Sequence, residues 1–374
     1  MRLAQITFHN AQNCGAVLQA WALQVVLKRL GHEVFLPSCN SVGAYRGHFR
    51  DFNLDRSSFF NGVKYCIWYL LVELLSFGSD ELKDWRFRTF LRRNLSVLNC
   101  RVDELPKFCD AVIFGSDQIW NPKWTGDETG YFLGERLPAG ISKIAYGASV
   151  GDLPLSDEHV NRVVEAVRRF DAVSLRESVM QRFLCDNDGR RPNIVCDPTL
   201  LLSAEEYLSI ADPRRLVKRP YLLFFSLRGN LLFEQKAYEL ACRLGLACIV
   251  VNMSQRGLWR YRMNTKIAVS PDRLLAYLRD ADYMLTDSFH GVALSIVLHK
   301  RFLALKVDET TPDGRISNLL KRTSLSDRLV DCRDVLSNVG TLTAAFPLES
   351  GNAIINMRID SEKWIRDALS AIGV

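Results

Sequence analysis

LAQITFHNAQNCGAVLQAWALQVVLKRLGHEVFL, residues 3–36, has the pattern of a strand, a loop, a helix and a second strand. The first apolar run ends in polar His9 and Asn10. Apolar residues then recur at three- and four-residue steps, the spacing of an amphipathic helix: Val17, Leu18, Trp21, Val25 and Leu30. Gly31 ends this helix, and residues 33–36 are again strand-like. This order predicts the opening of a βαβ unit in a parallel sheet.

Short apolar runs followed by polar loops continue through the first half of the chain. We expect buried strands at residues 111–114, 143–148 and 172–175. In an open parallel sheet, the residues just past the carboxyl ends of the strands line the ligand crevice. The polar residues that follow these strands are therefore the first candidates for chemistry.

A second alternating series begins near Tyr221. Strands are expected at residues 221–227, 247–252, 283–286 and 302–307, and helices at residues 232–244, 270–279 and 290–299. Ser270 as an N-cap and Pro271 in the first turn mark the start of one of these helices. Each half of the chain therefore predicts a parallel sheet of its own.

The length of 374 residues favours two domains, because it exceeds what one hydrophobic core usually serves. We place the boundary within residues 197–220, where prolines and charges accompany a short helix. This predicts Rossmann-like domains at residues 1–205 and 206–345, and a final segment, 346–374, whose helix at 361–372 crosses back. The expected fold is α/β and GT-B-like, with two parallel sheets facing a central cleft.

Composition narrows the classes of function. Hydrophobic residues make up 48% and charged residues 24% of the chain, which is typical of globular proteins. The net charge of +6 is spread over many segments. It suits anionic small substrates or an anionic membrane surface, and no RNP-type strand or zinc-finger spacing favours nucleic acid. The ten cysteines form no C-x-x-C pair and the opening MRLAQITFHN does not fit a secretory signal, so reduced thiols and a cytoplasmic location are expected.

Five segments place uncommon polar combinations at the ends of apolar runs. They are TFHNAQNCGA at 7–16, GSDQIWNP at 115–122, SLRES at 174–178, DPT at 197–199 and TDSFHG at 286–291. In this order they resemble the polysaccharide pyruvyl transferase family, from about residue 5 to about residue 330. The resemblance implies a GT-B-like transferase that takes phosphoenolpyruvate as donor. The product would carry pyruvate as a ketal on a sugar of a bacterial capsule or exopolysaccharide precursor.

The TDSFHG segment brings a strand end to a helix start. Free N–H groups at a helix start and the helix dipole suit a phosphate, so Ser288, His290 and Gly291 are candidates for the donor site. His290 is also our candidate for proton delivery, and a helix-capping histidine is the alternative.

Some family members carry Arg-Leu before this histidine, where this chain has Ser288 and Phe289. Another guanidinium should then hold the donor. Arg176, in SLRES, and Arg315 are the candidates, and a surface salt bridge is the alternative for Arg315.

The GSDQIWNP segment supplies a hydrogen-bond acceptor, a carboxylate and an amide in Ser116, Asp117 and Gln118. Asp117 is our candidate for the base that takes a proton from the sugar hydroxyl. The alternative is an aspartate that caps the following turn. Trp120 and Trp124 form either a sugar-stacking wall or part of the core.

The first loop offers Asn13 and Gly15 ahead of a helix, as binders of a second anion or of the acceptor. The resemblance places the acceptor on this N-terminal side and the donor on the C-terminal side. His9 reads equally well as a structural histidine or as a ligand.

Phosphoenolpyruvate and a glycan, for which the family implies a lipid-linked oligosaccharide, are the expected partners. We expect no cofactor and no metal, because the chain has no P-loop, no G-x-G-x-x-G after its first strand and no cluster at metal-ligand spacing.

Residues 59–77 and the basic helix expected at 80–93 either lie on the inner face of the membrane or form a buried helix pair. Leu82, Trp85, Phe90 and Leu91 would form the apolar side of the second helix. Two rival functions stay open: a glycosyltransferase that uses a nucleotide sugar, and a scaffold without catalysis.

Overall fold

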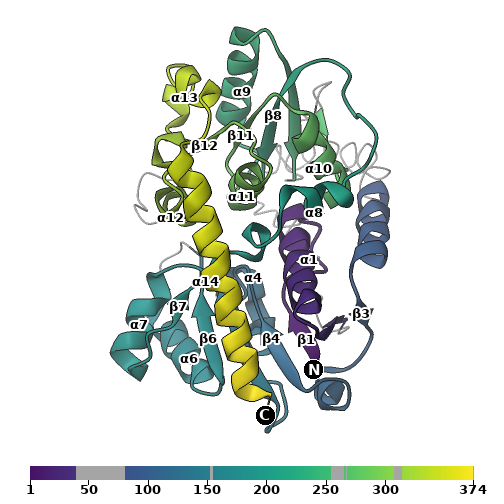
Figure 1. The fold of residues 1–374 in the computed structure, drawn as a ribbon, viewed down its shortest axis with the longest axis vertical. Helices are drawn as coiled ribbons and strands as arrows, with labels where there is room; N and C mark the ends of the chain where they lie inside the picture. Colours follow the sequence, from purple (N-terminus) through teal and green to yellow (C-terminus); the bar gives the residue numbers. More distant parts are fainter. Residues whose placement is uncertain (39–80, 152–154, 254–264, 267, 307–313, 374) are drawn as a thin grey trace, which may run out of the picture.

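The computed structural model describes residues 1–38, 81–151, 155–253, 265–266, 268–306 and 314–373 (Figure 1). Within these ranges the chain forms two parallel sheets, one in each half of Figure 1. The segment 59–77 lies outside the described residues. Among the helices that are described, none is both long and apolar enough to span a bilayer.

The first sheet has seven described strands in the order β3-β2-β1-β4-β5-β6-β7. Its strands are β1 (Arg2–Ile6), β2 (Glu33–Pro37), β3 (Val97–Leu98), β4 (Ala111–Phe114), β5 (Ser142–Ala148), β6 (Ala172–Leu175) and β7 (Asn193–Ile194). Its helices are α1 (Cys14–Arg29), an unlabelled helix at 81–94, η1 (Val102–Lys107), α4 (Pro122–Thr125), η2 (Gly126–Glu128), α5 (Thr129–Phe132), α6 (Asp157–Val167) and α7 (Val179–Asp188). Every pairing is parallel.

The second sheet has six described strands in the order β10-β9-β8-β11-β12-β13, again all parallel. They are β8 (Tyr221–Ser226), β9 (Ala247–Asn252), β10 (Thr265–Lys266), β11 (Tyr283–Thr286), β12 (Phe302–Leu305) and β13 (Leu329–Val330). The helices of this half are α9 (Leu231–Arg243), α10 (Pro271–Asp280), α11 (Phe289–Val297), α12 (Arg315–Arg322), η5 (Ser326–Arg328), η6 (Cys332–Asp334) and α13 (Val339–Thr343). The helices η3 (Pro198–Leu200) and α8 (Ala204–Ser209) lie between the two sheets in the sequence, and α14 (Leu348–Ile372) ends the chain.

Both sheets are doubly wound, and this arrangement confirms the predicted GT-B-like fold. The strand order reverses between β1 and β4 in the first sheet and between β8 and β11 in the second. Such reversals are the usual ligand positions in open α/β sheets. The loops that matter are therefore those after β1, β4, β8 and β11. The domain limits at 1–205 and 206–345 stay a prediction.

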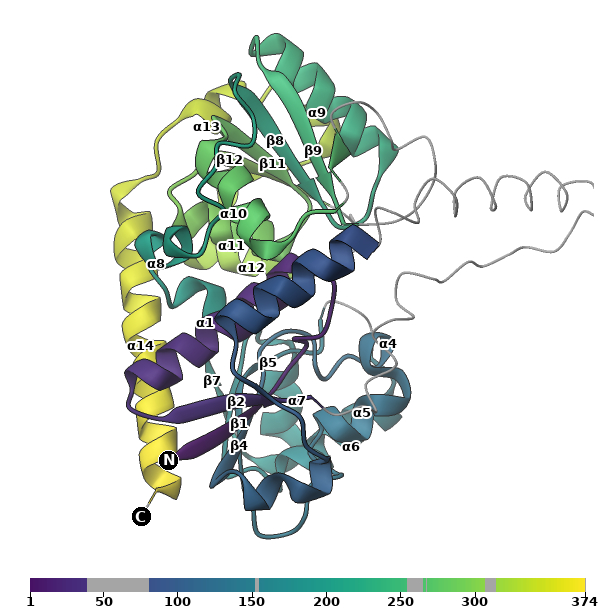
Figure 2. The same ribbon diagram turned by 90° about the vertical axis from the view of Figure 1, so that its right-hand side faces the viewer.

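Helix α1 connects the two halves. Asn13 caps it, with Oδ1 accepting hydrogen bonds from the N–H groups of Gly15 (2.9 Å) and Ala16 (3.4 Å). The helix packs on β2 of the first sheet and also contacts η3 and α10 (Figure 2). Because it is covered on several sides, nearly all of its side chains are buried, polar Gln19 and Gln24 among them.

The expected strands agree with the structure to within two residues, but two expected helices differ from it. In the helix at 81–94, Leu82 and Trp85 are exposed, while Phe87 and Phe90 are buried, so the buried stripe is rotated from the predicted one. The last helix starts at Leu348, thirteen residues before the expected start at Ser361. Exposed Ile355 and Ile359 blur the apolar spacing of its first half.

Helix α14 runs along the molecule from the second half to the first (Figure 1). The Arg358 guanidinium donates to the carbonyl oxygens of Leu200 and, at 2.8 Å, of Leu202. Ser361 Oγ accepts from the Cys196 N–H at 2.9 Å. These contacts attach α14 to the segment that joins the two sheets.

We expect Leu369→Ala to lower the free energy of unfolding by about 2–5 kcal/mol, because its buried side chain would leave a cavity under α14. Ile359→Ala, on the same helix but 59% exposed, should change it by less than about 0.5 kcal/mol. Urea denaturation measures both. Equal losses in the two variants would contradict the packing of α14.

Candidate functional site

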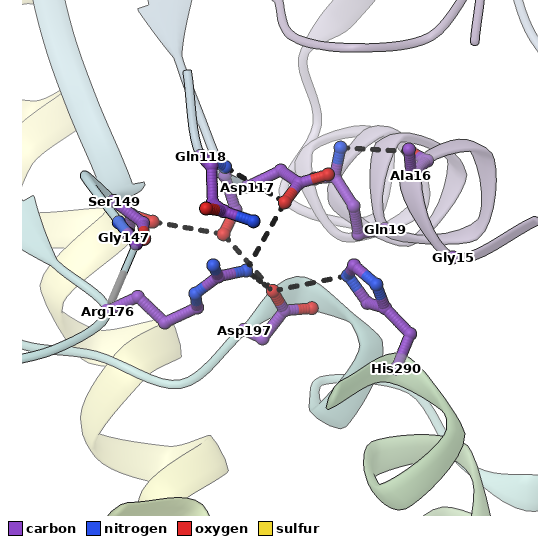
Figure 3. Close-up of polar contacts among 12 residues, drawn as sticks. Gly15, Ala16, Gln19, Asp117, Gln118, Gly147, Ser149, Arg176, Asp197 and His290 are labelled. Carbon is purple, nitrogen blue, oxygen red and sulfur yellow. Dashed lines mark hydrogen bonds and ion pairs between the residues drawn. The ribbon is translucent and has the colours of Figure 1, made fainter. Parts of the chain in front are cut away.

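The segments that the sequence singled out converge where the two halves meet. The short helix η3 contacts α1 of the first half and α11 of the second. Around it, Arg176, Asp197, Asp117 and His290 point toward one another from separate segments (Figure 3). All four side chains are buried. The site is therefore a buried polar cluster at the junction of the halves.

Arg176 is the centre of this cluster. It follows β6 and is only 4% exposed. Its Nε donates to Glu177 Oε1 at 2.7 Å, and its Nη1 donates to Asp197 Oδ2 at 2.8 Å and lies 3.8 Å from Asp117 Oδ1. Burial alone would lower the pKa of Arg176, but Glu177, Asp197 and Asp117 raise it above its ordinary value. The remaining nitrogen, Nη2, is buried and has no hydrogen-bond partner within the described residues.

Asp197 is the other half of the central ion pair, and both of its oxygens are occupied. Oδ1 accepts from the Thr199 N–H at 3.0 Å and from Thr199 Oγ1 at 2.7 Å, while Oδ2 accepts from Arg176 and from Ser116 Oγ at 3.3 Å. Burial alone would raise the pKa of this carboxyl, but His290, Arg176 and the Thr199 N–H hold it below its ordinary value. Asp197 therefore stays ionised at neutral pH.

His290 reaches the cluster from the first turn of α11. Its Nε2 lies 3.8 Å from Asp197 Oδ2, which is too far for a hydrogen bond, and this buried atom has no other partner in the described part of the chain. Burial lowers the pKa of His290, although Asp197 and Asp117 act to raise it. A neutral imidazole carries no charge, so at pH 7 Arg176 and the Thr199 N–H keep Asp197 ionised.

Gly15 makes room for the imidazole. A Cβ atom at this position would lie 2.3 Å from Nδ1 of His290 and 2.4 Å from its Cγ. Real Cβ atoms do not approach other atoms so closely. The first turn of α1 and the first turn of α11 therefore meet at Gly15, and the sequence candidates from opposite ends of the chain touch here.

The Asp117 carboxylate makes one contact within its own turn and one with the cluster. Its backbone has a φ of 72°, and Oδ1 accepts from the Gln118 N–H at 2.9 Å. The carboxylate thus has the turn-capping role that was the alternative, and it also lies near Arg176. The side-chain oxygen of Gln118 bonds to residues outside the cluster: Oε1 accepts from Asn121 (2.9 Å) and from Trp124 Nε1 (3.0 Å).

Of the two tryptophans, Trp120 is fully buried and donates from Nε1 to the Phe132 carbonyl at 3.2 Å. It belongs to the core. Trp124 is partly buried beside Gln118.

The helix-start candidates cap their own helices. Asn13 caps α1, and Ser288 caps α11 by accepting from the Gly291 N–H at 3.3 Å. Gly291 is required for packing, because a Cβ there would lie 2.4 Å from Thr286 Oγ1. Ser116 donates through Oγ to the Gly147 carbonyl at 3.0 Å as well as to Asp197.

The ring of Phe289, next to His290 in the sequence, lies close to two guanidinium groups. The Arg176 guanidinium lies 4.7 Å from the centre of the ring and that of Arg315 lies 5.8 Å from it, within the range of cation–π attraction. The two guanidinium groups therefore meet on the ring of Phe289. Arg315 begins α12, so the charge comes from the next helix.

Reasoning from the sequence missed three members of the cluster. Asp197 and Glu177 lie in quoted segments, DPT and SLRES, but were not taken as site residues. Their signal was their place directly after strand-like runs. Nothing in the sequence marks Phe289 as the ring on which the two arginines meet. Among the described residues, no group of His, Cys, Asp or Glu could hold a metal ion.

Two doubly wound sheets that meet at a buried cluster of charged side chains define a protein of the GT-B-like fold class. The family model described as polysaccharide pyruvyl transferase matches residues 13–309. The chain belongs to the polysaccharide pyruvyl transferase family.

A solved structure agrees with the fold. A UDP-N-acetylglucosamine 2-epimerase is similar over 100% of this chain and 95% of its own, with a TM-score of 0.52 and 10% identity. An S. aureus MnaA structure with UDP matches over 99% and 97%, with a TM-score of 0.49 and 12% identity. At such identity the likeness to the epimerase concerns the fold alone. No protein of curated function matches the sequence significantly.

We expect Asp197→Asn to lower the free energy of unfolding by about 3 kcal/mol or more at pH 7, because it removes the charge that Arg176 pairs with in the interior. Folding lowers the pKa of Asp197, so its stabilising effect is present above the ordinary carboxyl pKa and is lost as the pH falls through the lowered value. The cost should therefore shrink below about pH 4. Urea denaturation across pH tests this. Asp367→Asn, which breaks an exposed pair with Lys363, is the control and should leave stability unchanged; an equal effect would contradict the assignment.

We expect Gly15→Ala to displace the His290 ring and to lower the thermal midpoint, because the new methyl group needs the space of the imidazole. Gly351→Ala, in α14 with no atom near its Cβ position, should raise stability by up to about 1 kcal/mol. Calorimetry and the His290 imidazole signals in NMR report the two effects. Unchanged His290 signals in Gly15→Ala would show that α1 and α11 do not meet there.

Proposed function

We propose that this protein transfers a pyruvyl group from phosphoenolpyruvate to a sugar of a bacterial surface-polysaccharide precursor, forming a pyruvate ketal. The observation that carries the proposal is a pair of buried nitrogens, Arg176 Nη2 and His290 Nε2, on either side of Asp197, for which the described part of the chain provides no hydrogen-bond partner. An unpartnered buried polar atom costs about 1–3 kcal/mol, so two in one cluster indicate a ligand-binding site. A small anion with several oxygens matches such atoms.

The charges already present in the cluster determine which further charge an anionic ligand needs in order to bind. Arg176 is already paired with Glu177 and Asp197, so those carboxylates neutralise its charge. An entering anion therefore needs further positive charge. Arg315, beside Phe289, and the N-terminus of α11 supply it. A carboxylate and a phosphate on one small molecule would use all of these groups.

Binding such an anion also changes His290. Its pKa is lowered by burial in the structure, and a neighbouring negative charge stabilises the imidazolium form. We infer that the donor raises the pKa of His290 and brings a proton to the site with it. The imidazolium can then protonate C3 of phosphoenolpyruvate, which leaves positive charge at C2 shared with the enol oxygen.

The acceptor side completes the reaction. A sugar hydroxyl attacks C2 and gives its proton to the Asp117 carboxylate. The C2–O bond to phosphate then breaks, phosphate leaves with the electron pair, and a second hydroxyl closes the ketal and releases its proton. Phosphoenolpyruvate and a diol thus yield a ketal and inorganic phosphate. Asp117 fits this role because it lies at the strand-order reversal of the first sheet, 3.8 Å from Arg176.

The acceptor, on this proposal, is a lipid-linked oligosaccharide at the cytoplasmic face of the membrane. The mild basic excess of the chain suits that surface. Co-sedimentation with anionic vesicles would support the location, and binding to neither anionic nor neutral vesicles would contradict it.

The test of the function is release of phosphate from phosphoenolpyruvate in the presence of candidate glycans. Phosphoenolpyruvate should also raise the thermal midpoint, while UDP and GDP should not. Stabilisation by a nucleotide and none by phosphoenolpyruvate would favour the nucleotide-sugar glycosyltransferase instead. Stabilisation by none of them would contradict the proposed donor.

We expect His290→Asn to lower turnover at least about a hundredfold, since one electrostatic contact is worth roughly 2–4 kcal/mol in a transition state. His299→Asn, at an exposed position two residues past the end of the same helix, is the matched control and should keep full turnover. Asparagine tolerates the positive φ of 51° at that position. Phosphate release gives the rates and circular dichroism the fold; near-normal turnover in the His290 variant would refute the role of this histidine.

A further inference from the structure

His9 is another buried histidine, in the first half of the chain. It lies in the loop between β1 and α1, and β1 is the strand at which the order of that sheet reverses. It is 5% exposed. Its place at the reversal makes it a candidate for ligand contact, and its hydrogen bonds decide what kind of contact that is.

One hydrogen bond fixes the tautomer of His9. Nδ1 lies 3.1 Å from the carbonyl oxygen of Thr7. A carbonyl oxygen only accepts, so Nδ1 carries the proton and donates it. Burial lowers the pKa of His9 to about 4, although the bond to Thr7 acts to raise it. The ring is then neutral at pH 7. Nε2 is left with a free lone pair and acts as an acceptor.

That acceptor atom is buried and has no partner among the residues that the structure describes. The loop around it is well tied down. Thr7 Oγ1 donates to the Ser116 carbonyl at 3.0 Å and accepts from Gln19 Nε2 at 2.8 Å. His9 is thus fixed to the strand end that carries Asp117. Buried polar atoms are nearly always paired, so an unpaired one on a loop held by hydrogen bonds requires an explanation.

We propose that His9 Nε2 accepts a hydrogen bond from a hydroxyl group of the glycan acceptor, which makes His9 a specificity-determining residue. The inference rests on the proposed function. A lone pair repels phosphate and carboxylate oxygens but matches an O–H donor, and sugars present many such groups. The donor site, with Arg176 and His290, offers the opposite chemistry. The two histidines therefore divide the substrates between them, an anion at His290 and a hydroxyl at His9.

Two substitutions separate this role from a structural one. In His9→Asn the amide nitrogen takes the place of Nδ1 and keeps the bond to Thr7, but no acceptor remains at the Nε2 position. In His9→Gln the side chain reaches the Nε2 position with an amide oxygen. We expect the KM for the glycan to rise about tenfold or more in His9→Asn, the worth of one hydrogen bond, and to recover in His9→Gln. The KM for phosphoenolpyruvate should stay unchanged in both.

A second measurement does not depend on turnover. In the full chain labelled with 15N-histidine, the His9 signals are assigned by their loss in His9→Asn. At pH 7 they should show a protonated Nδ1 and an unprotonated Nε2. Methyl glucoside, galactoside, mannoside and N-acetylglucosaminide, each added with phosphoenolpyruvate, are the probes. At least one of them should shift the Nε2 resonance upfield.

The outcomes keep the two proposals apart. A proton on Nε2, or no shift with any of the four glycosides, would overturn the role of His9. A rise in the KM for the glycan that His9→Gln does not reverse would also overturn it. A shift of Nε2 without phosphate release by the wild-type protein would support glycan contact and count against pyruvyl transfer.

Discussion

The need to pair one buried guanidinium organises the junction between the two halves. A charge that is taken out of water costs several kcal/mol unless it is matched by opposite charge and hydrogen bonds. Arg176 meets that need with Glu177 and Asp197, and it has Asp117 nearby. These carboxylates follow different strands of the first sheet. Their common partner therefore fixes several loops at once.

The pair of Arg176 and Asp197 also positions His290, which comes from the second half of the chain. Asp197 opens η3, and η3 contacts both α1 and α11. His290 at the start of α11 is held between Gly15 on one side and Asp197 on the other. Helix α14 attaches to the same connecting segment through Arg358 and Ser361. The elements that join the halves thus converge on the segment that carries the central carboxylate, which makes the stability of the junction inseparable from the geometry of the site.

Sequence reasoning predicted the fold better than the site. Each strand has a local signal, an apolar run that ends in polar residues, and the alternation of strands and helices points to parallel sheets. This signal failed for the first half of α14. Apolar Ile355 and Ile359 lie on its exposed side, so the apolar residues of this segment do not form one regular stripe.

For the candidate site, the sequence singled out segments that meet at the junction, but pairing inside them depends on three-dimensional contact. Arg176 was recognisable from its motif. That Glu177 and Asp197 neutralise it, and that Phe289 brings Arg315 beside it, follows only from how the loops meet. In the same way, the tautomer of His9 depends on a hydrogen bond to Thr7 that no pattern of residues predicts.

The most direct test of the account is a crystal structure of the protein with phosphoenolpyruvate. We expect the compound beside η3, with its oxygens within hydrogen-bond distance of Arg176 Nη2 and His290 Nε2, and with the pair of Arg176 and Asp197 intact. If the compound bound elsewhere, or left both nitrogens without a partner, the buried cluster would not be the donor site.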